Sequence, residues 1–132
     1  MSEMNGSFTL QVRCHPESLR RVRESLRGLE LEPDALSAVT VVANELVANS
    51  IRHSDLAEEE QIEIEVRCQG GYVRIDVRDG GTGFTAPQQS AETGRGFPMV
   101  QALSRHFGIS RNGRTQAWAE VELPEPPSRS RR

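Results

Sequence analysis

The sequence predicts an α/β (α+β) two-layer sandwich, in which a mostly antiparallel mixed sheet carries all its helices on one face. Each segment with a two-residue period is apolar on one side only, whereas a parallel sheet covered on both faces would show continuous apolar runs. Segments with apolar spacings of three and four residues occur between these strands, so helices are expected to cover the apolar side. The 132 residues are about the size of a single domain.

The first half of the chain predicts one strand and two helices. Residues 8–14 alternate strictly between apolar and polar side chains and predict a strand. Pro16 opens a helical segment whose apolar side chains end at Leu29. Pro33 starts a longer helix that runs to about His53, with an apolar stripe along its length.

The second half predicts a hairpin, a helix and two more strands. Strands at 61–68 and 72–79 are joined by two glycines, a strong hairpin signal because primed turns need positive φ. Residues 97–107 predict a third helix with four apolar side chains on one side. A short strand at 107–110 and a final strand at 115–123 follow.

These elements place a single domain at residues 8–123. Residues 1–7 are expected to be a flexible N-terminus, and residues 124–132, rich in proline and arginine without periodicity, a disordered tail. The sequence has no run of eighteen apolar residues, so no membrane-spanning helix is predicted, and the N-terminal residues do not have the pattern of a signal peptide. The two cysteines lack metal-site spacing and fit a reducing cytoplasm.

Charge and composition exclude several classes of function. The net charge of −3, from 16 basic and 19 acidic residues, argues against a nucleic-acid binder that works by bulk charge. Those basic residues are all arginine. Without lysine, the chain has no Walker-type phosphate loop, no strand lysine of a eukaryotic-type kinase and no Schiff-base chemistry.

Three polar residues in the second predicted helix form a candidate site. Glu45, Asn49 and His53 are four residues apart and therefore share one side of the helix. The flanks of this stripe are apolar, and a partly buried carboxylate needs a partner or a task. A carboxylate one turn from an amide oxygen also suits Mg²⁺, which takes few protein oxygens and completes its shell with water and phosphate. An ordinary solvated helix face is the alternative.

A second candidate lies at the end of the strand 72–79. The two-residue period that turns its apolar side chains to the core also turns Asp79 inward. Gly81 and Gly83 follow closely and let the backbone turn sharply beneath a ligand. An Asp beside glycines is often only a turn former, but the inward phase favours a ligand.

The third candidate precedes the helix at 97–107. Gly94 and Gly96 expose amides at the positive end of a helix, which predicts an anion site. Arg95 between them adds a permanent charge suited to phosphate. A plain helix start is the alternative.

In their order along the chain, these segments resemble the nucleotide-binding boxes of the GHKL ATPase and kinase superfamily, which has the Bergerat fold. The matching segments are Glu45-x-x-x-Asn49-x-x-x-His53 for the N box, Asp79-x-Gly81-x-Gly83 for the G1 box and Gly94-x-Gly96-Phe97-x-x-Val100 for the G2 box. A free-standing domain of this size is most similar to the bacterial anti-sigma-factor serine/threonine kinases.

The resemblance implies ATP and Mg²⁺ as cofactors. It implies that Glu45 is the general base, that Asn49 ligates Mg²⁺ and that Asp79 accepts a hydrogen bond from the adenine amine. The glycines of the G1 box would make room for the nucleotide, and the amides of the G2 box would hold the phosphates. The implied nucleotide-binding set is Asn49, His53, Asp79, Gly81, Gly83, Gly94, Arg95, Gly96 and Phe97.

Members of this family silence a sigma factor and phosphorylate an anti-anti-sigma (STAS-type) protein. The resemblance therefore implies transcription regulation in the bacterial cytoplasm, with no direct contact to nucleic acid or membrane. It is compatible with a homodimer. A nucleotide-binding partner-recognition module without phosphoryl transfer is the alternative, because a lid of only ten residues, 84–93, excludes water poorly. The catalytic domain of a sensor histidine kinase is disfavoured, because no dimerisation helix is expected before residue 8.

Overall fold

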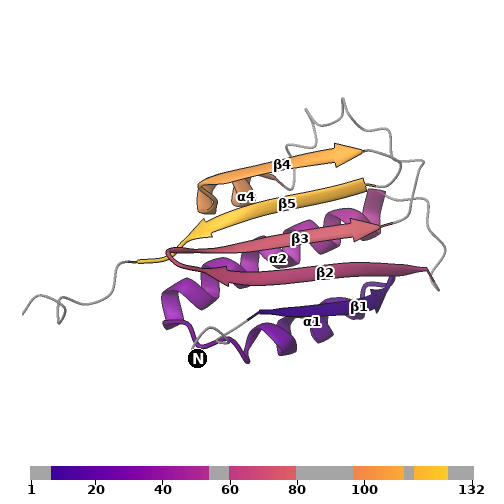
Figure 1. The fold of residues 1–132 in the computed structure, drawn as a ribbon. Helices are drawn as coiled ribbons and strands as arrows, with labels where there is room; N and C mark the ends of the chain where they lie inside the picture. Colours follow the sequence, from indigo (N-terminus) through magenta and orange to yellow (C-terminus); the bar gives the residue numbers. More distant parts are fainter. Residues whose placement is uncertain (1–6, 54–59, 80–96, 112–114, 125–132) are drawn as a thin grey trace, which may run out of the picture.

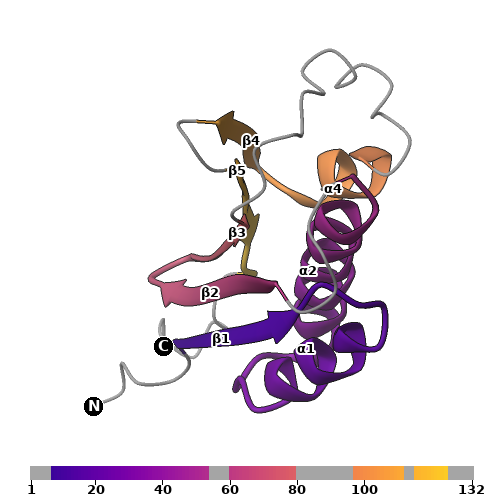
Figure 2. The same cartoon turned by 90° about the vertical axis from the view of Figure 1, so that its right-hand side faces the viewer.

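The computed structural model describes residues 7–53, 60–79, 97–111 and 115–124. In this part of the chain, five strands form one sheet in the order β1-β2-β3-β5-β4, and three helices lie on one side of it (Figures 1 and 2). The elements are β1 (Phe8–Arg13), α1 (Ser18–Leu26), α2 (Pro33–His53), β2 (Gln61–Gln69), β3 (Tyr72–Asp79), α4 (Phe97–Leu103), β4 (His106–Arg111) and β5 (Thr115–Glu122).

The predicted two-layer sandwich with its helices on one face is confirmed. All four strand pairings among the described residues are antiparallel, so this sheet is more regular than the mixed sheet that was expected. None of the described helices is both long and apolar enough to cross a membrane. The predicted flexible start and disordered tail lie outside the described residues, apart from Ser7 and Pro124.

The core forms where the apolar side of the sheet meets α2. This helix runs across the sheet between α1 and α4, and its stripe of fully buried side chains packs on the inward-facing residues of the strands (Figures 1 and 2). Val42 and Leu46 on the helix and Ile64 and Ile75 on the sheet are at most 1% exposed. Burying one such side chain stabilises a fold by about 1.5–3 kcal/mol. The position of α2 over the sheet is therefore strongly determined.

The hairpin between β2 and β3 has the turn that its glycines predict. Gly71 has a φ of 106°, a conformation that L side chains rarely adopt. Its carbonyl accepts a hydrogen bond of 2.9 Å from the amide of Leu123, which also ties the turn to the end of the chain's last strand. Gln69 and Tyr72 are directly paired, so the loop has two residues.

The last helix ends earlier than predicted. The helix predicted over 97–107 ends at Leu103, and β4 already begins at His106. The amide of Arg105 donates to the carbonyl of Glu120 at 2.8 Å, so the chain joins the sheet at once. Phe107, predicted on the helix, pairs with Ala119 and packs against the core from the sheet.

The first helix is shorter than predicted at both ends. The chain after β1 makes turns in which Pro16 accepts a hydrogen bond of 3.1 Å from Leu19, and α1 starts only at Ser18. After Leu26, tight turns end the helix before Leu29, which still reaches the core.

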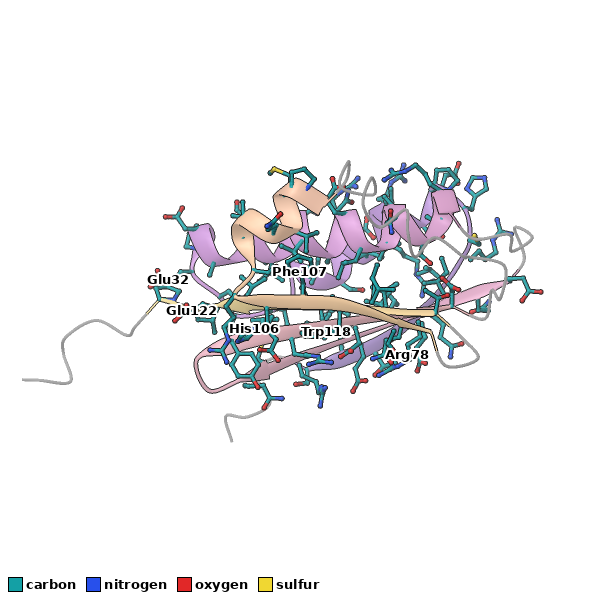
Figure 3. The ribbon with its side chains drawn as sticks, turned by 90° about the horizontal axis from the view of Figure 1, so that it is seen from above. Glu32, Arg78, His106, Phe107, Trp118 and Glu122 are labelled. Carbon is teal, nitrogen blue, oxygen red and sulfur yellow. The ribbon has the colours of Figure 1, made fainter. Side chains whose placement is uncertain are left out.

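The sheet face away from the helices carries a connected set of charged side chains. Figure 3 shows Arg78 and Trp118 on this face and Phe107 on the opposite, helix-covered one. At its centre Asp76 is only 1% exposed, because Arg74 contacts both of its oxygens at 3.1 Å. Gln116 adds a third hydrogen bond, of 2.8 Å, from the neighbouring strand. The outer face is therefore a second, ionic layer of packing.

Arg74 joins several parts of this layer. Its guanidinium also reaches Glu120 at 3.1 Å and lies 4.4 Å from the ring centre of Trp118. The indole in turn lies over Gly108, where a Cβ atom would come within 3.0 Å of it. One arginine thus links strands β3 and β5 through two carboxylates and an aromatic ring.

The ionic layer couples stability to pH through Asp76. Burial alone would raise the pKa of this carboxyl group, but the hydrogen bonds from Arg74 and Gln116 and the charges of Arg74 and Arg78 outweigh it and hold the pKa below its ordinary value. A carboxyl group with a lowered pKa in the folded state stabilises the fold above its unfolded pKa, near 4. This contribution is lost as pH falls through the folded pKa.

Asp76→Asn should lower the free energy of unfolding at pH 7 by about 1–3 kcal/mol, because the arginine loses a charged, two-oxygen acceptor. It should also flatten the loss of stability of the wild type below about pH 4. Urea unfolding between pH 3 and 7 measures both effects. Glu122→Gln is the matched control, since Glu122 is exposed on the same face; its change should stay within about 0.5 kcal/mol. Equal stability of Asp76→Asn and wild type would show that the layer contributes nothing.

Candidate functional site

Buried polar residues gather where α2 and β3 both end. Among the described residues, the buried polar or charged side chains are Asn49, Asp76, Asp79 and Thr115. Asp76 belongs to the outer ionic layer, whereas the other three lie on the helix side of the sheet or on α2. Polar groups in an apolar core are costly unless they are paired. This end of the fold is therefore the candidate site.

Asp79 has the inward orientation that its strand phase predicts. Val73, Ile75 and Val77 of the same strand are buried in the core, and Asp79 is 3% exposed. Its Oδ2 accepts a hydrogen bond of 2.5 Å from the hydroxyl of Ser50 on α2. The contact fixes the carboxylate between the two layers of the sandwich.

Asn49 and Glu45 lie on α2 next to this contact. Asn49 is 6% exposed, and Glu45 is half-buried one turn earlier, about 6 Å along the helix axis. Leu46 and Val47 between them are fully buried. The guanidinium of Arg23 on α1 donates to the amide oxygen of Asn44 at 3.4 Å, which ties the helix carrying Glu45 to α1. At Asn49 this stripe is not an ordinary solvated helix face.

The other predicted site residues lie at or beyond the limits of the described structure. His53 is the last residue of α2, and Phe97 is the first residue of α4. Gly81, Gly83, Gly94, Arg95 and Gly96 lie outside the described residues.

Two residues of the site were not singled out from the sequence. Thr115 is 8% exposed and directly opposite Asp79 in the β3–β5 register. The alternation of β5 could have predicted that Thr115 points inward, because Thr115 is two residues before the buried Ala117 and lies on the same face of the strand. Ser50 follows Leu46 by four residues and Val47 by three, which places it toward the core side of the helix.

The oxygen donors present fit Mg²⁺ shared with a nucleotide. No group of three or more His, Cys, Asp or Glu side chains that could hold a metal occurs in the described part of the chain. A cage made by the protein alone is therefore not found there. One buried amide oxygen, on Asn49, matches an ion that takes one or two protein ligands and fills its shell with phosphate and water.

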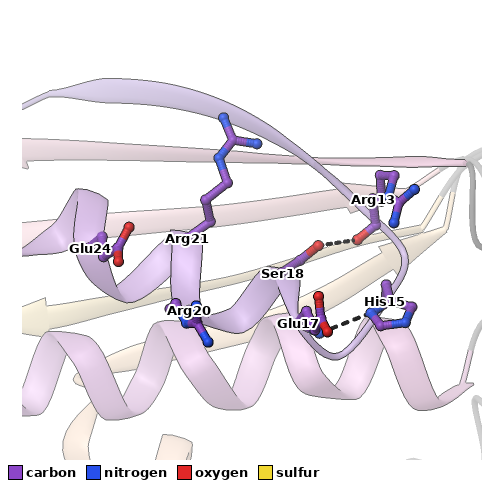
Figure 4. A pocket seen from close by; sticks show the side chains of 7 residues that line it. All are labelled: Arg13, His15, Glu17, Ser18, Arg20, Arg21 and Glu24. Atoms are coloured by element: carbon purple, nitrogen blue, oxygen red, sulfur yellow. Dashed lines mark hydrogen bonds between the residues drawn. The ribbon is translucent and has the colours of Figure 1, made fainter.

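A separate hollow of about 470 Å³ lies where β1 leads into α1 (Figure 4). Its lining residues are Arg13, His15, Glu17, Ser18, Arg20, Arg21 and Glu24. Two internal hydrogen bonds shape it: the Ser18 hydroxyl donates to the Arg13 carbonyl at 2.7 Å, and the Glu17 amide donates to His15 Nδ1 at 3.1 Å. It contains none of the predicted nucleotide-binding residues and is distinct from the site at Asp79.

Comparison with known proteins agrees with this geometry. The histidine kinase-like ATPase domain model matches residues 11–120. No curated protein matches the chain. Among solved structures, the RsbU and RsbW domains of Rv1364c from Mycobacterium tuberculosis match with a TM-score of 0.71 and 20% identity, over 92% of this chain and 33% of that one. This chain spans about a third of the length of that one, and the likeness shows a shared fold.

The matched family model includes α2 with Glu45 and Asn49, β3 with Asp79, and most of β5. It covers well over half of the chain, and the predicted resemblance to the GHKL superfamily is confirmed. This protein belongs to the histidine kinase-like ATPase domain family.

Proposed function

We propose that this protein is an ATP-binding anti-sigma regulatory factor with protein serine/threonine kinase activity. The observation that carries the proposal is a buried carboxylate, Asp79, held by Ser50 beside the buried amide of Asn49. Family membership makes ATP the expected ligand. The acceptor would be a Ser or Thr of an anti-anti-sigma protein of the STAS type.

Asp79 would read the base of the nucleotide. An ionised carboxylate only accepts hydrogen bonds, so it complements the exocyclic amine of adenine. Its burial removes competing water, which strengthens each contact and penalises a base that offers no donor. In this arrangement β3 fixes the position of Asp79, and Ser50 fixes its orientation.

Asn49 would hold the metal at the phosphate end of the nucleotide. Mg²⁺, when bound, neutralises charge on the phosphates during transfer. The Asn49 side chain is an uncharged oxygen donor on a well-packed helix, so it can orient the ion without adding negative charge near the phosphates. His53, Arg95 and Phe97 and the glycines of the G1 and G2 boxes complete the proposed nucleotide-binding set.

Glu45 would be the general base. It is half-buried and one helical turn from Asn49, and Leu46 and Val47, the next two residues of the helix, are fully buried. In the transfer step its carboxylate takes the proton of the acceptor hydroxyl as that oxygen forms its bond to the γ-phosphorus and the bond to the β-phosphate oxygen breaks.

The regulatory role would be exercised in the bacterial cytoplasm on a sigma factor and its antagonist. The fold that this chain shares with the RsbU and RsbW domains of Rv1364c supports the proposal. A second candidate is a nucleotide-binding recognition module without transfer, favoured by the ten-residue connection between the G1 and G2 boxes.

Asp79→Asn should remove most of the rise in Tm that ADP and Mg²⁺ produce in the wild type. The amide is a weaker acceptor than the carboxylate and adds donors facing the adenine amine, so affinity should fall about 10- to 100-fold. Calorimetry and thermal melting with ADP measure both effects. Asp34→Asn, at an exposed position early in α2, is the control. Unchanged affinity in Asp79→Asn would refute the assignment of the base.

Asn49→Ala should weaken the part of ADP binding that depends on Mg²⁺, by about tenfold, and change metal-free binding less. Titrations with and without Mg²⁺ separate the two. Asn44→Ala removes the same group from a half-buried position on the same helix and serves as the control. Equal losses with and without the metal would mean that Asn49 is structural.

Glu45→Gln should leave nucleotide affinity broadly unchanged and slow phosphoryl transfer to the partner by about 10²–10⁴-fold. Glutamine has nearly the same volume but cannot take up the proton. Single-turnover transfer of labelled γ-phosphate to a STAS-type protein of the same organism measures the rate. An unchanged rate would reject Glu45 as the base, and absence of transfer from the wild type would favour the recognition module.

A further inference from the structure

The hydroxyl of Ser50 has an unusual use for a serine inside a helix. Such a hydroxyl commonly bonds back to the carbonyl four residues earlier or points to solvent. Here it crosses from α2 to the sheet and donates to Oδ2 of Asp79 at 2.5 Å. The acceptor is 3% exposed and Ser50 is half-buried, so the contact lies at the edge of the packed interior.

This contact fixes which hydrogen bonds the pair can offer to a ligand. A hydroxyl has one hydrogen and two lone pairs, and an ionised carboxylate has lone pairs alone. With its hydrogen directed at Asp79, Ser50 has only acceptor capacity left. Toward any group that reaches both residues, the pair therefore presents acceptors and no donor.

A surface of acceptors discriminates between purines. The 6-amino group of adenine donates hydrogen bonds, whereas the 6-oxo group of hypoxanthine accepts them. An oxo group brought against buried acceptors would leave unpaired polar atoms on both sides, and such mismatches reject a ligand far more strongly than a missing apolar contact does.

We propose that Ser50, by donating its only hydrogen to Asp79, makes this site selective for 6-aminopurine nucleotides over 6-oxopurine nucleotides. The inference rests on the proposed nucleotide binding and adds a residue that acts on the ligand through Asp79. Without the hydroxyl, the carboxyl group of Asp79 can turn, so that its acceptor oxygens are no longer held toward the 6-position of the base. Loss of Ser50 should therefore relax the selectivity more than it weakens binding.

The test compares the affinities for ADP and for inosine diphosphate (IDP) in wild type and four variants. Ser50→Ala and Ser50→Val lack the hydroxyl, and Ser50→Thr keeps it with the shape of valine. Ser37→Ala removes a hydroxyl from an exposed position of the same helix and is the matched control. Circular dichroism melting verifies that each variant is folded before its affinities are measured by calorimetry.

In the wild type, ADP should bind roughly 100-fold or more tightly than IDP. The ratio should fall about tenfold or more in Ser50→Ala and in Ser50→Val, and it should stay near the wild-type value in Ser50→Thr and Ser37→Ala. A purely structural role of Ser50 would weaken both nucleotides equally and leave the ratio unchanged, which would overturn the inference alone. A wild type that binds neither nucleotide would overturn the proposed function as well.

Discussion

The two-residue alternation of β3 is the constraint on which both faces of this protein depend. Asp76 and Asp79 are three residues apart, so the alternation turns one carboxylate outward and the other toward the helices. A slip of one residue in the pairing with β2 or β5 would exchange the two faces of the strand and expel the core valines. The hydrophobic core therefore holds in register the same strand that carries the candidate site.

The two carboxylates of β3 are stabilised by different means. Asp76 is held by Arg74 and Gln116 on strands, within a layer of charges that satisfy one another. Asp79 accepts a hydrogen bond from the neutral hydroxyl of Ser50, and the buried Thr115 is paired with it on the neighbouring strand β5. The ion pairs of Arg74 and Arg78 thus lie on the face away from the candidate site. On the inward face, Asp79 lies between the two layers of the sandwich, at the candidate site.

Much of the fold, and the inward position of Asp79 in the site, could be predicted from local sequence patterns. The alternation of β3 correctly predicted that Asp79 points inward, and two glycines correctly predicted the hairpin with its positive φ. The predicted end of the last helix was wrong. Leu103 and Phe107 are four residues apart, a spacing that places two side chains on one side of a helix and also on one face of a strand. The hydrogen bond from the amide of Arg105 to the carbonyl of Glu120 on β5 draws the chain into the sheet and favours the strand.

Residues whose importance arises from pairing between distant segments could not be found in this way. Ser50 and Asp79 are 29 residues apart, and Asp79 and Thr115 are separated by a further 36. Nothing in the neighbourhood of Ser50 in the sequence indicates a carboxylate across the sandwich. Its position on the helix predicts that it faces the core, and only the packing of α2 on β3 supplies the partner.

The outer ionic layer also has a permanent charge pattern. All the cationic side chains that meet carboxylates there are arginines, and the whole chain has 16 arginines and no lysine. Arg74 contacts two carboxylates and an indole at once, which a single ammonium group could not match in geometry. Because a guanidinium is not neutralised by the acylation that silences lysine amines, enzymes that acetylate or succinylate lysine side chains have no target on this face.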